Sequence, residues 1–348
     1  MNIWFDITHV PPLNFFKALI IKLAKESHTV YVTVLDRGKL PKIVQNELGN
    51  RQNIIVTVIG QHRMNKWSVL WDANILRLGQ LFLWSKGKKI NVSISTGLLN
   101  CIISRFKGIK SYTFIDDPQA VTYKAISLFS TKNHCCLYKI PTNYHLSKRD
   151  VILPTLKEWA YLAPSVFTPN ISVLTDYAIM PHRYLFVREV SVGTSNYASQ
   201  EADSVLQIAN LIPGNIPVLL SLEKKDKYKE YPQNWILLQE PLQDVHSLIY
   251  YSAGLISSGD SMAREASLLG VPSYYLGIRY SMPANAVAAD VGSLDNQQTM
   301  SIEKWIEKTL SSQEKKPLLQ EEVRASINGK FVDINQYMYD LVTQANKK

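Results

Sequence analysis

The sequence predicts an α/β protein in which parallel, doubly wound sheets form two domains. Apolar runs of strand length alternate along the chain with segments of helical periodicity, and the turns between them are short. With 348 residues the chain exceeds one ordinary hydrophobic core, which favours two domains. Its composition, 46% hydrophobic and 19% charged, is that of a globular protein rather than a disordered one.

The first half of the chain shows this alternation clearly. Residues 2–7 are expected to form a buried strand because they are largely apolar, and a helix is expected over residues 14–25. The apolar face of that helix comprises Phe15, Phe16, Leu19, Ile20 and Leu23. Further strands are expected at residues 28–34, 53–59, 92–95, 111–115 and 132–140, and helices at residues 39–49, 69–85 and 99–107.

The carboxyl ends of these strands carry the candidate catalytic residues, because ligands of doubly wound sheets gather beyond that edge. The polar residues expected there are His9, Asp36, His62, Arg63 and the pair Asp116-Asp117. His9 is the first candidate for a base because it lies in the first strand-to-helix turn. The acidic pair could act as a general base or bind a hydroxyl group. It could equally form an ordinary Asx turn.

A second set of strands begins after Pro181-His182, which places a domain boundary near residue 180. Strands are expected at residues 184–190, 218–222, 235–239, 254–256 and 273–276. Helices are expected at residues 197–211, 244–253, 300–310 and 323–341. Arg188 lies near the end of the first of these strands, and a guanidinium group can bond two phosphate oxygens at once.

The most informative stretch is residues 254–277, which reads as a strand, a Gly/Ser turn, a short helix, Gly-x-Pro and a second strand. Asp260 or Ser261 can cap the helix, and Gly270 can end it. Such a turn directs unpaired N–H groups and the positive end of the helix dipole beyond the strand, where an anion is held well. Glu265 lies about one turn into the helix, where its carboxylate could accept hydrogen bonds from a ribose.

The alternative interpretation of this stretch is an ordinary βαβ turn with a salt-bridged Glu265 and Arg264. The net charge of +9 favours anionic partners, namely nucleotides, nucleic acid or an anionic membrane face, although it could serve only solubility. The helix expected at residues 69–85 ends near Lys86, Lys88 and Lys89. It could lie on a membrane surface. We favour a sheet-covering helix whose basic end complements its dipole.

The cysteine pattern and the hydropathy indicate the compartment. The chain has an odd number of cysteines, Cys101, Cys135 and Cys136, and they form no CxxC motif. This argues against a disulfide framework or a zinc site and fits a reducing cytosol. No signal peptide and no apolar run of spanning length is visible. We therefore expect a cytoplasmic protein that could lie peripherally at the inner face of the cell membrane.

The stretch at residues 254–277 resembles the nucleotide-diphosphate-sugar signature of GT-B fold proteins. In lipid II-forming N-acetylglucosaminyltransferases the pattern is Ser-Gly, a few residues, Glu, and then Gly-x-Pro. Ser258-Gly259, Glu265 and Gly270-Val271-Pro272 keep that spacing. The hydrolysing and non-hydrolysing UDP-N-acetylglucosamine 2-epimerases carry a similar Ser-Gly-Gly…Glu element.

The chain also resembles a largely uncharacterised prokaryotic GT-B-like family, a domain of unknown function. The matching pieces are IWFDI at residues 3–7, FFK at residues 15–17 and GDSMAREASLLGVP at residues 259–272. The family pattern GGTMAREAxLLGxP has a second Gly where this chain has Asp260, and Thr where it has Ser261. A carboxylate repels a phosphate, so Asp260 either points away as the helix cap or weakens the anion site.

This resemblance implies a GT-B architecture of two Rossmann-like domains facing across a cleft. It implies an acceptor-side domain over residues 1–180, a nucleotide-sugar-binding domain over residues 181–325, and a helix over residues 326–348 that could pack back on the first domain. The implied donor-binding residues are Arg188, Ser258, Gly259, Ser261, Met262, Arg264 and Glu265. The candidates for the acceptor's base are, in order of preference, His9, Asp116, Asp117 and His62.

The implied function is metal-independent glycosyl transfer from a nucleoside-diphosphate sugar, with a UDP-sugar as the first candidate. The acceptor would be a saccharide or a lipid-linked molecule in cell-surface polysaccharide or glycolipid assembly. No metal or cofactor is expected, because Asp116-Asp117 lacks DxD spacing and helix dipoles can stabilise a leaving diphosphate. One alternative is a UDP-N-acetylglucosamine 2-epimerase-like enzyme. Another is a non-catalytic protein that binds nucleic acid or a membrane surface, although no aromatic-interleaved basic motif supports nucleic acid.

Overall fold

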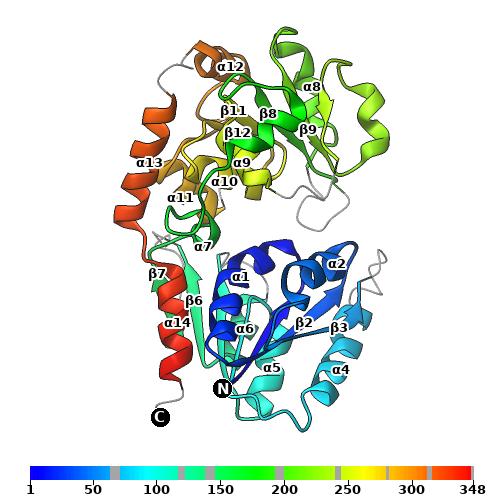
Figure 1. Ribbon diagram of the computed structural model, residues 1–348, viewed down its shortest axis with the longest axis vertical. Coiled ribbons are helices and arrows are strands. Elements are labelled where there is room, and N and C mark those ends of the chain that lie inside the picture. The colour runs from blue at the N-terminus through cyan, green and yellow to red at the C-terminus, as the bar shows by residue number, and fades with distance from the viewer. Residues whose placement is uncertain are drawn as a thin grey trace. The chain divides into compact units, whose positions relative to one another are not determined.

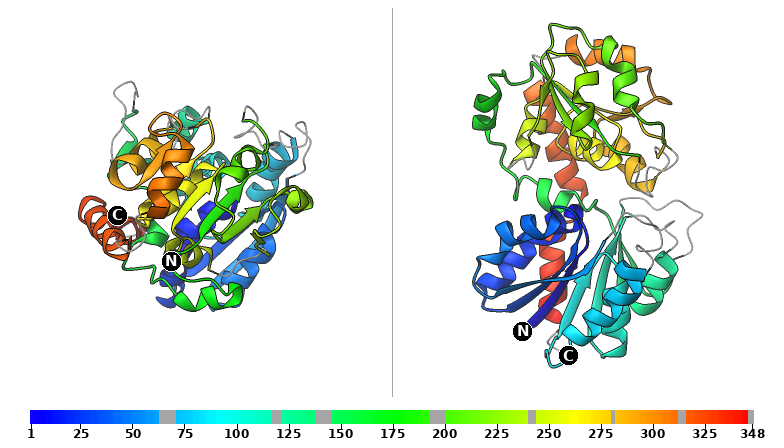
Figure 2. Two further views of the ribbon diagram at one scale, coloured as in Figure 1. Left: turned by 90° about the horizontal axis from the view of Figure 1, so that it is seen from above. Right: turned by 90° about the vertical axis from the view of Figure 1, so that its right-hand side faces the viewer.

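The structure is a computed structural model, and it describes residues 1–62, 71–116, 122–137, 146–192, 200–239, 244–279, 282–311 and 316–345. The chain divides into two compact units (Figures 1 and 2). Unit 1 comprises Met1–Tyr161 and Phe331–Lys348, and unit 2 comprises Leu162–Lys330. Each unit is one parallel sheet with helices on both of its faces, as the alternation of strands and helices predicts.

The sheet of unit 1 has seven strands in the order β3-β2-β1-β4-β5-β6-β7, and every neighbouring pair is parallel. The strands are β1 (Asn2–Ile7), β2 (Thr29–Asp36), β3 (Ile54–Gln61), β4 (Val92–Ser95), β5 (Lys110–Ile115), β6 (Lys132–Cys136) and β7 (Asp150–Leu153). All but β7 were expected. The missing prediction has a physical cause, since β7 is short and begins with polar Asp150 at the sheet edge.

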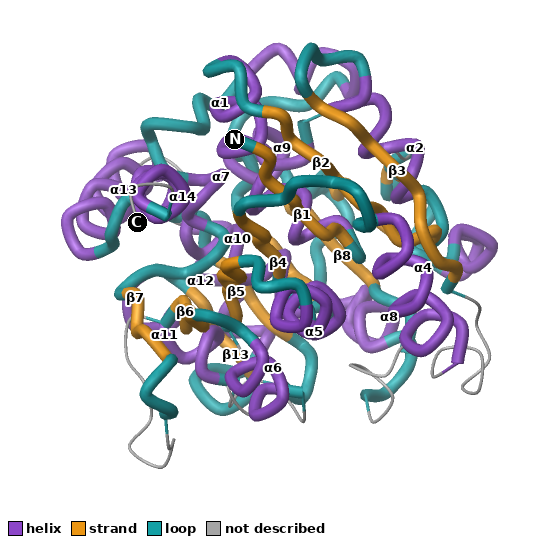
Figure 3. Tube along the Cα trace, turned by 90° about the horizontal axis from the view of Figure 1, so that it is seen from below, coloured by secondary structure: helices purple, strands orange, loops and turns teal. Residues whose placement is uncertain are grey.

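The two faces of this sheet are covered by different helices, because successive strand residues point to opposite sides. Phe5 of β1 faces α1 (Val10–Lys25), α2 (Leu40–Val44), η1 (Gln45–Gly49) and α14 (Ile334–Gln344). Trp4 faces α4 (Arg77–Trp84), which follows η2 (Trp71–Leu76), and α5 (Leu98–Phe106). α6 (Tyr123–Phe129) packs next to α5 (Figure 3). α1 begins at Val10 instead of residue 14, because Pro11 and Pro12 are accommodated in its first turn.

A buried ion pair joins β1 to α4. The Arg77 guanidinium donates to both carboxylate oxygens of Asp6, at 3.1 and 2.6 Å, and also to the carbonyl of Ile59 at 2.9 Å. Thr33 donates to the same carboxylate at 2.6 Å. Both charges are almost fully buried. Because each is matched by several hydrogen bonds, the pair is tolerated in the core, and loss of one partner would leave the other charge unpaired.

The sheet of unit 2 has six strands in the order β10-β9-β8-β11-β12-β13, again all parallel. The strands are β8 (Leu185–Glu189), β9 (Val218–Leu222), β10 (Ile236–Leu237), β11 (Gly254–Ser257), β12 (Ser273–Tyr275) and β13 (Leu294–Asn296). The sequence analysis did not anticipate β13 or the helix α11 (Pro283–Val291) before it. Ala-rich α11 has little apolar periodicity, and β13 is only three residues long.

Helices flank this second sheet as well. Its core combines strand residues such as Val187 and Leu220 with Val205 of α8 (Ser204–Ile208) and Trp305 of α12 (Ile302–Ser311). The remaining helical segments are η3 (Ile171–Tyr177), η4 (Ala209–Leu211), η5 (Lys225–Glu230), α9 (Val245–Tyr250), α10 (Asp260–Leu268) and α13 (Lys316–Lys330). Asp244 caps α9 as expected, accepting a hydrogen bond from the Ser247 N–H at 3.0 Å.

The unit boundaries fall at 161/162 and 330/331, whereas the sequence analysis placed them at 180/181 and 325/326. Residues after 161 pack on unit 2, where the Asn170 N–H donates to the Ser247 hydroxyl at 2.9 Å and Arg324 donates to the Phe167 carbonyl at 3.1 Å. The expected single helix over residues 323–341 is wrong. The structure has two helices there, one that ends at Lys330 and a second, α14, that begins at Ile334. Asp333 caps α14 by accepting a hydrogen bond from the Gln336 N–H at 3.0 Å.

Two further features concern the cysteines and the length of the helices. The three cysteines are buried and free. Within the described ranges, no helix has both the length and the apolar character that a membrane span requires.

Candidate functional site

Both sheets reverse their strand order at one point, and that point locates the candidate sites. The reversal lies between β1 and β4 in unit 1 and between β8 and β11 in unit 2. Ligands of doubly wound sheets bind beyond the carboxyl ends of the strands at this reversal. In unit 1 the chain places His9 there, directly after β1, and in unit 2 it places Arg188 and the turn at residues 258–259 there.

The turn between β11 and α10 has the predicted strand–turn–helix form. β11 ends at Ser257, Gly259 is the extended N-cap with φ −104°, and α10 begins at Asp260. The Ser257 hydroxyl donates to the Gly259 carbonyl at 2.7 Å and accepts from its N–H at 3.0 Å. Gly270, with φ 72°, follows the helix as expected. The first N–H groups of α10 have no acceptor within the helix, so an anion beyond this edge would meet its positive end.

Ser258 fastens this turn to β8. It is fully buried, its hydroxyl accepts a hydrogen bond from the Val190 N–H at 2.9 Å, and its N–H donates to the Arg188 carbonyl at 3.0 Å. Gln200 donates to the Ser258 carbonyl at 2.8 Å. A hydroxyl that accepts from Val190 can still donate its own proton, but this one is fully buried. The predicted contact between Ser258 and a diphosphate stays a prediction. Ser261 and Met262 are half-buried in the first turn of α10.

The carboxylate of Asp260 is engaged by two arginines. It lies 3.3 Å from a guanidinium nitrogen of Arg264 and 3.2 Å from one of Arg279, and the N-cap position of α10 is occupied by Gly259. Its negative charge is therefore balanced within the protein. Arg264 is itself buried and donates to Asn285 at 2.8 Å, which links α10 to α11. The predicted phosphate contact of Arg264 stays a prediction, because in this structure its guanidinium serves that link.

Arg188 and Arg279 are the more accessible cations at this edge. The Arg188 side chain is 15% exposed and donates to the Ser221 hydroxyl and to Glu223, both at 2.8 Å. The Arg279 side chain is 26% exposed. No individual role was predicted for Arg279, because its position after β12 does not reveal that it reaches back to Asp260. Asp260 could have indicated such a residue, because an acid in a predicted anion-binding turn requires a nearby cation to balance its charge.

Glu265 lies against a histidine that sequence reasoning also missed. Its carboxylate is 3.3 Å from Nε2 of His246, which is in α9, and the His246 ring contacts Phe167 with ring centroids 6.1 Å apart. Glu265 is only 9% exposed. A ribose could therefore reach this carboxylate only together with His246. The predicted ribose contact stays a prediction.

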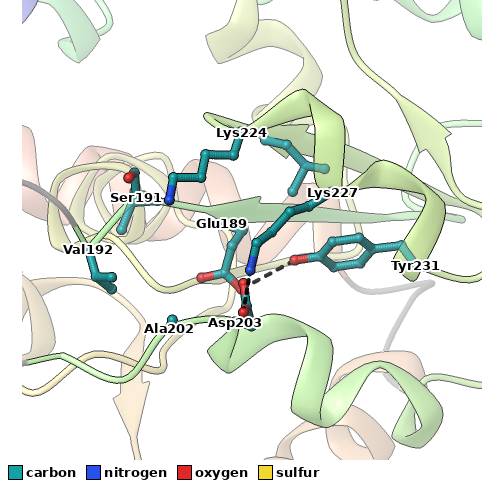
Figure 4. Close-up of a pocket in the computed structure, with 10 residues that line it drawn as sticks. Glu189, Ser191, Val192, Ala202, Asp203, Lys224, Lys227 and Tyr231 are labelled. Carbon is teal, nitrogen blue, oxygen red and sulfur yellow. Dashed lines mark hydrogen bonds and ion pairs between the residues drawn. The ribbon is translucent and has the colours of Figure 1, made fainter.

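A small pocket lies at the same sheet edge, between β8, β9 and α8 (Figure 4). Its volume is about 30 Å³, room for a water molecule and not for a nucleotide. Glu189 lines it and accepts hydrogen bonds from the Val205 N–H at 2.7 Å and the Tyr231 hydroxyl at 3.4 Å, and Lys227 pairs with Asp203 beside it (Figure 4). Burial raises the pKa of Glu189. These contacts hold together the elements that flank the anion seat.

In unit 1, His9 is the N-cap residue of α1, and its Nδ1 lies 2.9 Å from the Thr8 hydroxyl. Desolvation, then the positive charges of Lys157 and Arg37, lower the pKa of His9 to about 4, while Asp116 acts in the opposite direction. Because part of the His9 side chain is exposed to solvent, desolvation is not the whole cause, and the two cations contribute to the lowered pKa. His9 is consequently neutral at pH 7 and can accept a proton.

Asp116 follows β5 and pairs with Lys157, with 2.9 Å between its carboxylate oxygen and Nζ. Both side chains are mostly buried. Burial opposes the charge of Lys157, yet the carboxylates of Asp116 and Glu158 raise its pKa above the usual value, so it is a permanent cation. The structure thus brings His9, Asp116 and Lys157 into one electrostatic cluster. Asp117 lies outside the described residues.

His62 lies at the same edge, just after β3, where its N–H donates to the Asp36 carbonyl at 2.8 Å. Desolvation and then Arg37 lower its pKa. His62 and His9 therefore share Arg37 as a neighbouring charge. Among the residues that the structure describes, no group of three or more His, Cys, Asp or Glu side chains is placed to hold a metal ion.

Comparison with protein families matches residues 1–82 to the model of a family described as "Protein of unknown function (DUF354)". The match includes the IWFDI and FFK pieces and confirms the predicted resemblance to an uncharacterised family over that stretch. No curated protein sequence matches the chain.

Several solved structures resemble the whole chain. UDP-GlcNAc 2-epimerase from Neisseria meningitidis, bound to UDP-GlcNAc, is 13% identical with a TM-score of 0.61, covering 99% of each chain. Glycosyltransferase VinC in complex with DTDP is 10% identical with a TM-score of 0.65, covering 100% of each chain. Acinetobacter baumannii MurG is 15% identical with a TM-score of 0.56, covering 99% of each chain. At such identities the likeness shows the fold alone: this chain is an α/β protein of the GT-B fold class, similar to glycosyltransferases, MurG and UDP-GlcNAc 2-epimerases.

Proposed function

We propose that this protein is a metal-independent glycosyltransferase that uses a nucleoside-diphosphate sugar, with a UDP-sugar as the first candidate. The acceptor is a saccharide or a lipid-linked molecule in cell-surface polysaccharide or glycolipid assembly. The observation that carries the proposal is the start of α10, which lies at the strand reversal of unit 2 beside Arg188. A nine-residue helix with its N-terminus at that point offers N–H groups and a positive dipole to a diphosphate.

The donor side supplies charge without a metal. In the proposed complex the N–H groups of Ser261 and Met262 and the guanidinium of Arg188 hold the diphosphate oxygens. Arg279 is a further cation at this edge. As the bond between the sugar's anomeric carbon and the diphosphate oxygen breaks, the electron pair leaves with the diphosphate. Fixed dipoles and cations aimed at that oxygen stabilise the growing negative charge.

The acceptor side supplies the base. His9 is neutral at pH 7, so its imidazole can take the proton of an acceptor hydroxyl while that oxygen bonds to the anomeric carbon. Desolvation and then the charges of Lys157 and Arg37 keep the imidazole unprotonated before the reaction. Asp116, paired with Lys157, favours the protonated form once the proton has arrived. This assignment gives His9 the role of base and Asp116 a supporting role.

The acceptor class bears on location. A lipid-linked acceptor would place the protein at the inner face of the cell membrane, in contact with anionic lipid. That location is part of this proposal and does not depend on which sugar is transferred.

A UDP-GlcNAc 2-epimerase-like activity is the second candidate. Two observations support it: the whole-chain similarity to such an epimerase, and the neutral imidazole of His9 beside Asp116 and Lys157, which can accept a proton. Incubation with UDP-GlcNAc and no acceptor separates the two candidates. Epimer, or free sugar with UDP, supports the epimerase. Release of UDP only after an acceptor is added supports transfer.

The donor site is tested by calorimetric titration with UDP and a panel of nucleotide sugars. Arg188→Ala should weaken diphosphate binding by roughly 10- to 100-fold, because a charged hydrogen bond contributes on the order of 1.5–3 kcal/mol. Arg183→Ala is the matched control, since Arg183 is exposed and lies just before the amino end of the same strand. Equal effects of the two substitutions, or no binding of any nucleotide by the wild type, would refute the donor site.

A further inference from the structure

The ends of α4 and α5 form a surface that the proposed chemistry does not use. These helices pack side by side on one face of the unit 1 sheet (Figure 3). Both end where the chain enters a strand, α4 before β4 and α5 before β5. Their ends therefore lie at the amino edge of the sheet, whereas His9 and Asp116 lie at the carboxyl edge. The two edges are opposite sides of one parallel sheet.

Three apolar side chains stand open at this amino edge. Leu83 is 68% exposed, Phe106 is 75% exposed and Phe82 is 44% exposed. Single exposed apolar residues are ordinary. These three come from the last turns of two packed helices, and Lys107, next to Phe106, donates to the Phe82 carbonyl at 3.1 Å. We call Phe82, Leu83 and Phe106 the apolar tips.

The apolar tips are surrounded by positive charge. Between Asp72 and Asp116 the sequence has no acidic residue. In that stretch Arg77 is buried against Asp6, and the other basic residues are Lys86, Lys88, Lys89, Arg105, Lys107 and Lys110. Desolvation, then Lys86 and Lys88, lower the pKa of Lys107, so these cations are close enough to repel one another. Crowded like charges favour binding of an anionic partner.

Part of this charge serves the helix itself. Lys88 donates to the Trp84 carbonyl at 2.7 Å and Lys107 to the Phe82 carbonyl, both in the last turn of α4. This bears out the expectation that the basic end complements the helix dipole. Helix capping does not explain the exposed side chains of Lys86, Lys89 and Arg105. It does not explain the apolar tips either.

A cationic pocket opens beside the apolar tips. It has a volume of about 250 Å³ and is lined by Arg105, Lys110 and Arg149, with no acidic residue in its described lining. The guanidinium of Arg149 donates to the carbonyls of Leu128 and Ser130, and the ammonium of Lys110 donates to the Ala345 carbonyl at 2.5 Å. These partners are neutral, so the pocket keeps its positive charge and suits a phosphate group.

We propose that this amino edge of unit 1 docks on an anionic phospholipid bilayer, with the apolar tips in the interface and a lipid phosphate in the pocket of Arg105, Lys110 and Arg149. Charge complementarity favours an anionic surface, and the most exposed aliphatic tip, Leu83, favours a bilayer over nucleic acid, since it cannot stack on bases. The membrane location belongs to the proposed function, but this docking does not need a nucleotide. The carboxyl edge, at the opposite ends of the strands, would then face away from the bilayer, so of the two proposed acceptor classes this docking favours a saccharide that extends from the membrane.

Flotation with vesicles tests this docking. The wild type should bind phosphatidylcholine vesicles that contain phosphatidylglycerol and should not bind vesicles of phosphatidylcholine alone. Lys86→Glu with Lys89→Glu should weaken binding by roughly tenfold or more, at about 1 kcal/mol per cation. Leu83→Ser with Phe106→Ser should weaken it as well. Arg149→Gln should weaken binding to the vesicles that contain phosphatidylglycerol, because it removes one of the pocket's cations.

Matched controls lie in unit 2. Leu318 is 68% exposed, the same as Leu83, and Lys304 is exposed on α12. Leu318→Ser and Lys304→Glu should leave vesicle binding unchanged. Equal effects of Leu83→Ser and Leu318→Ser would overturn the proposal. So would salt-sensitive binding of RNA without binding of vesicles, or complete release from vesicles by inorganic phosphate. Nucleotide affinity measured on each variant checks folding and shows whether the donor site stands when the docking fails.

Discussion

The two strand reversals have the same topology and different helix starts. In unit 2, α10 begins after Gly259 with Asp260, Ser261 and Met262, each of which has a backbone N–H group. In unit 1, α1 begins after His9 with Val10 and two prolines, Pro11 and Pro12, which have none. Two of the first four N–H groups of α1 are therefore missing, so its start has fewer donors for an anion than the start of α10. We accordingly assign the diphosphate to unit 2.

The side chains at the two strand reversals also differ between the units. In unit 2, the acid nearest the helix start, Asp260, is balanced by Arg264 and Arg279, while Arg188 remains accessible. In unit 1, desolvation and then the cations Lys157 and Arg37 lower the pKa of the His9 imidazole and keep it neutral. We therefore expect an anion at the reversal of unit 2, where it would compete with Glu223 for Arg188, and a proton acceptor at the reversal of unit 1. On this hypothesis, strand order places the ligand site and the first helical turn selects the ligand.

The largest expected effect concerns the base in unit 1. His9→Asn should lower the turnover of glycosyl transfer by roughly 100- to 10,000-fold, the usual contribution of a general base. Nucleotide binding, which we assign to unit 2, should be unchanged. The measurement is steady-state release of UDP in the presence of an acceptor, together with a titration of UDP.

His62→Asn is the comparison variant, because His62 lies at the same sheet edge and also has a lowered pKa. It should reduce turnover much less than His9→Asn. A larger effect at His62 would reverse the order of the two candidates. A loss of nucleotide affinity in His9→Asn would contradict the division of roles between the units.

The next largest effect is expected when the first-turn proline of α1 is introduced into α10. Ser261→Pro gives α10 a proline at the position that Pro11 occupies in α1, and it removes one N–H donor. Proline is tolerated in a first helical turn, so the fold should persist. UDP affinity should fall by roughly 10- to 100-fold, the worth of a hydrogen bond to a charged oxygen. Calorimetric titration measures it.

Ser261→Ala keeps the N–H group and removes only the hydroxyl, so it separates the two contributions. It should cost less affinity than Ser261→Pro. If the two variants bind UDP equally well, the backbone of α10 does not hold the diphosphate. Circular dichroism of both variants shows whether α10 persists.

Much of the fold could be predicted from the sequence because the strands are continuous apolar runs. β1, β4 and β9 occupy the expected residues, and the turn at β11–α10 follows from Gly259 and Gly270. What failed lacks such a signal. β13 has three residues, α11 has a weak apolar face, and the break before α14 depends on one capping aspartate. The unit boundary depends on long-range contacts such as that of Arg324 with Phe167.

The candidate sites were predicted less completely, because residue type and position do not fix a side chain's partner. The spacing placed Ser258, Arg264 and Glu265 in the right turn, but it could not show that Val190, Asn285 and His246 engage them. Arg279 and Lys157 reach their acids from distant segments, so no local pattern marks them. His9 was found because β1 and the following helix start are unambiguous.

The smallest expected effect is a shift in the titration of His9. Lys157→Met removes a cation that lowers the pKa of His9 and also frees the Asp116 carboxylate, which raises it. Both changes favour imidazolium, so the pKa of His9 should rise from about 4 towards the ordinary value of 6.5. NMR titration of the His9 ring measures this directly. Since the base must be unprotonated, activity is lost as pH falls through this pKa, and the acid limb of kcat/KM should move to higher pH.

Two further variants make this titration decisive. Arg37→Met should raise the pKa of His9 less, because Arg37 perturbs it less than Lys157 does, and Lys42→Met is the control for loss of an exposed lysine. At pH 7 all three variants should retain an unprotonated His9 and most of their activity. A pKa of His9 that does not move in Lys157→Met would mean that burial alone keeps the imidazole neutral. The contrast between the units would then lie in the helix starts and not in the charges around them.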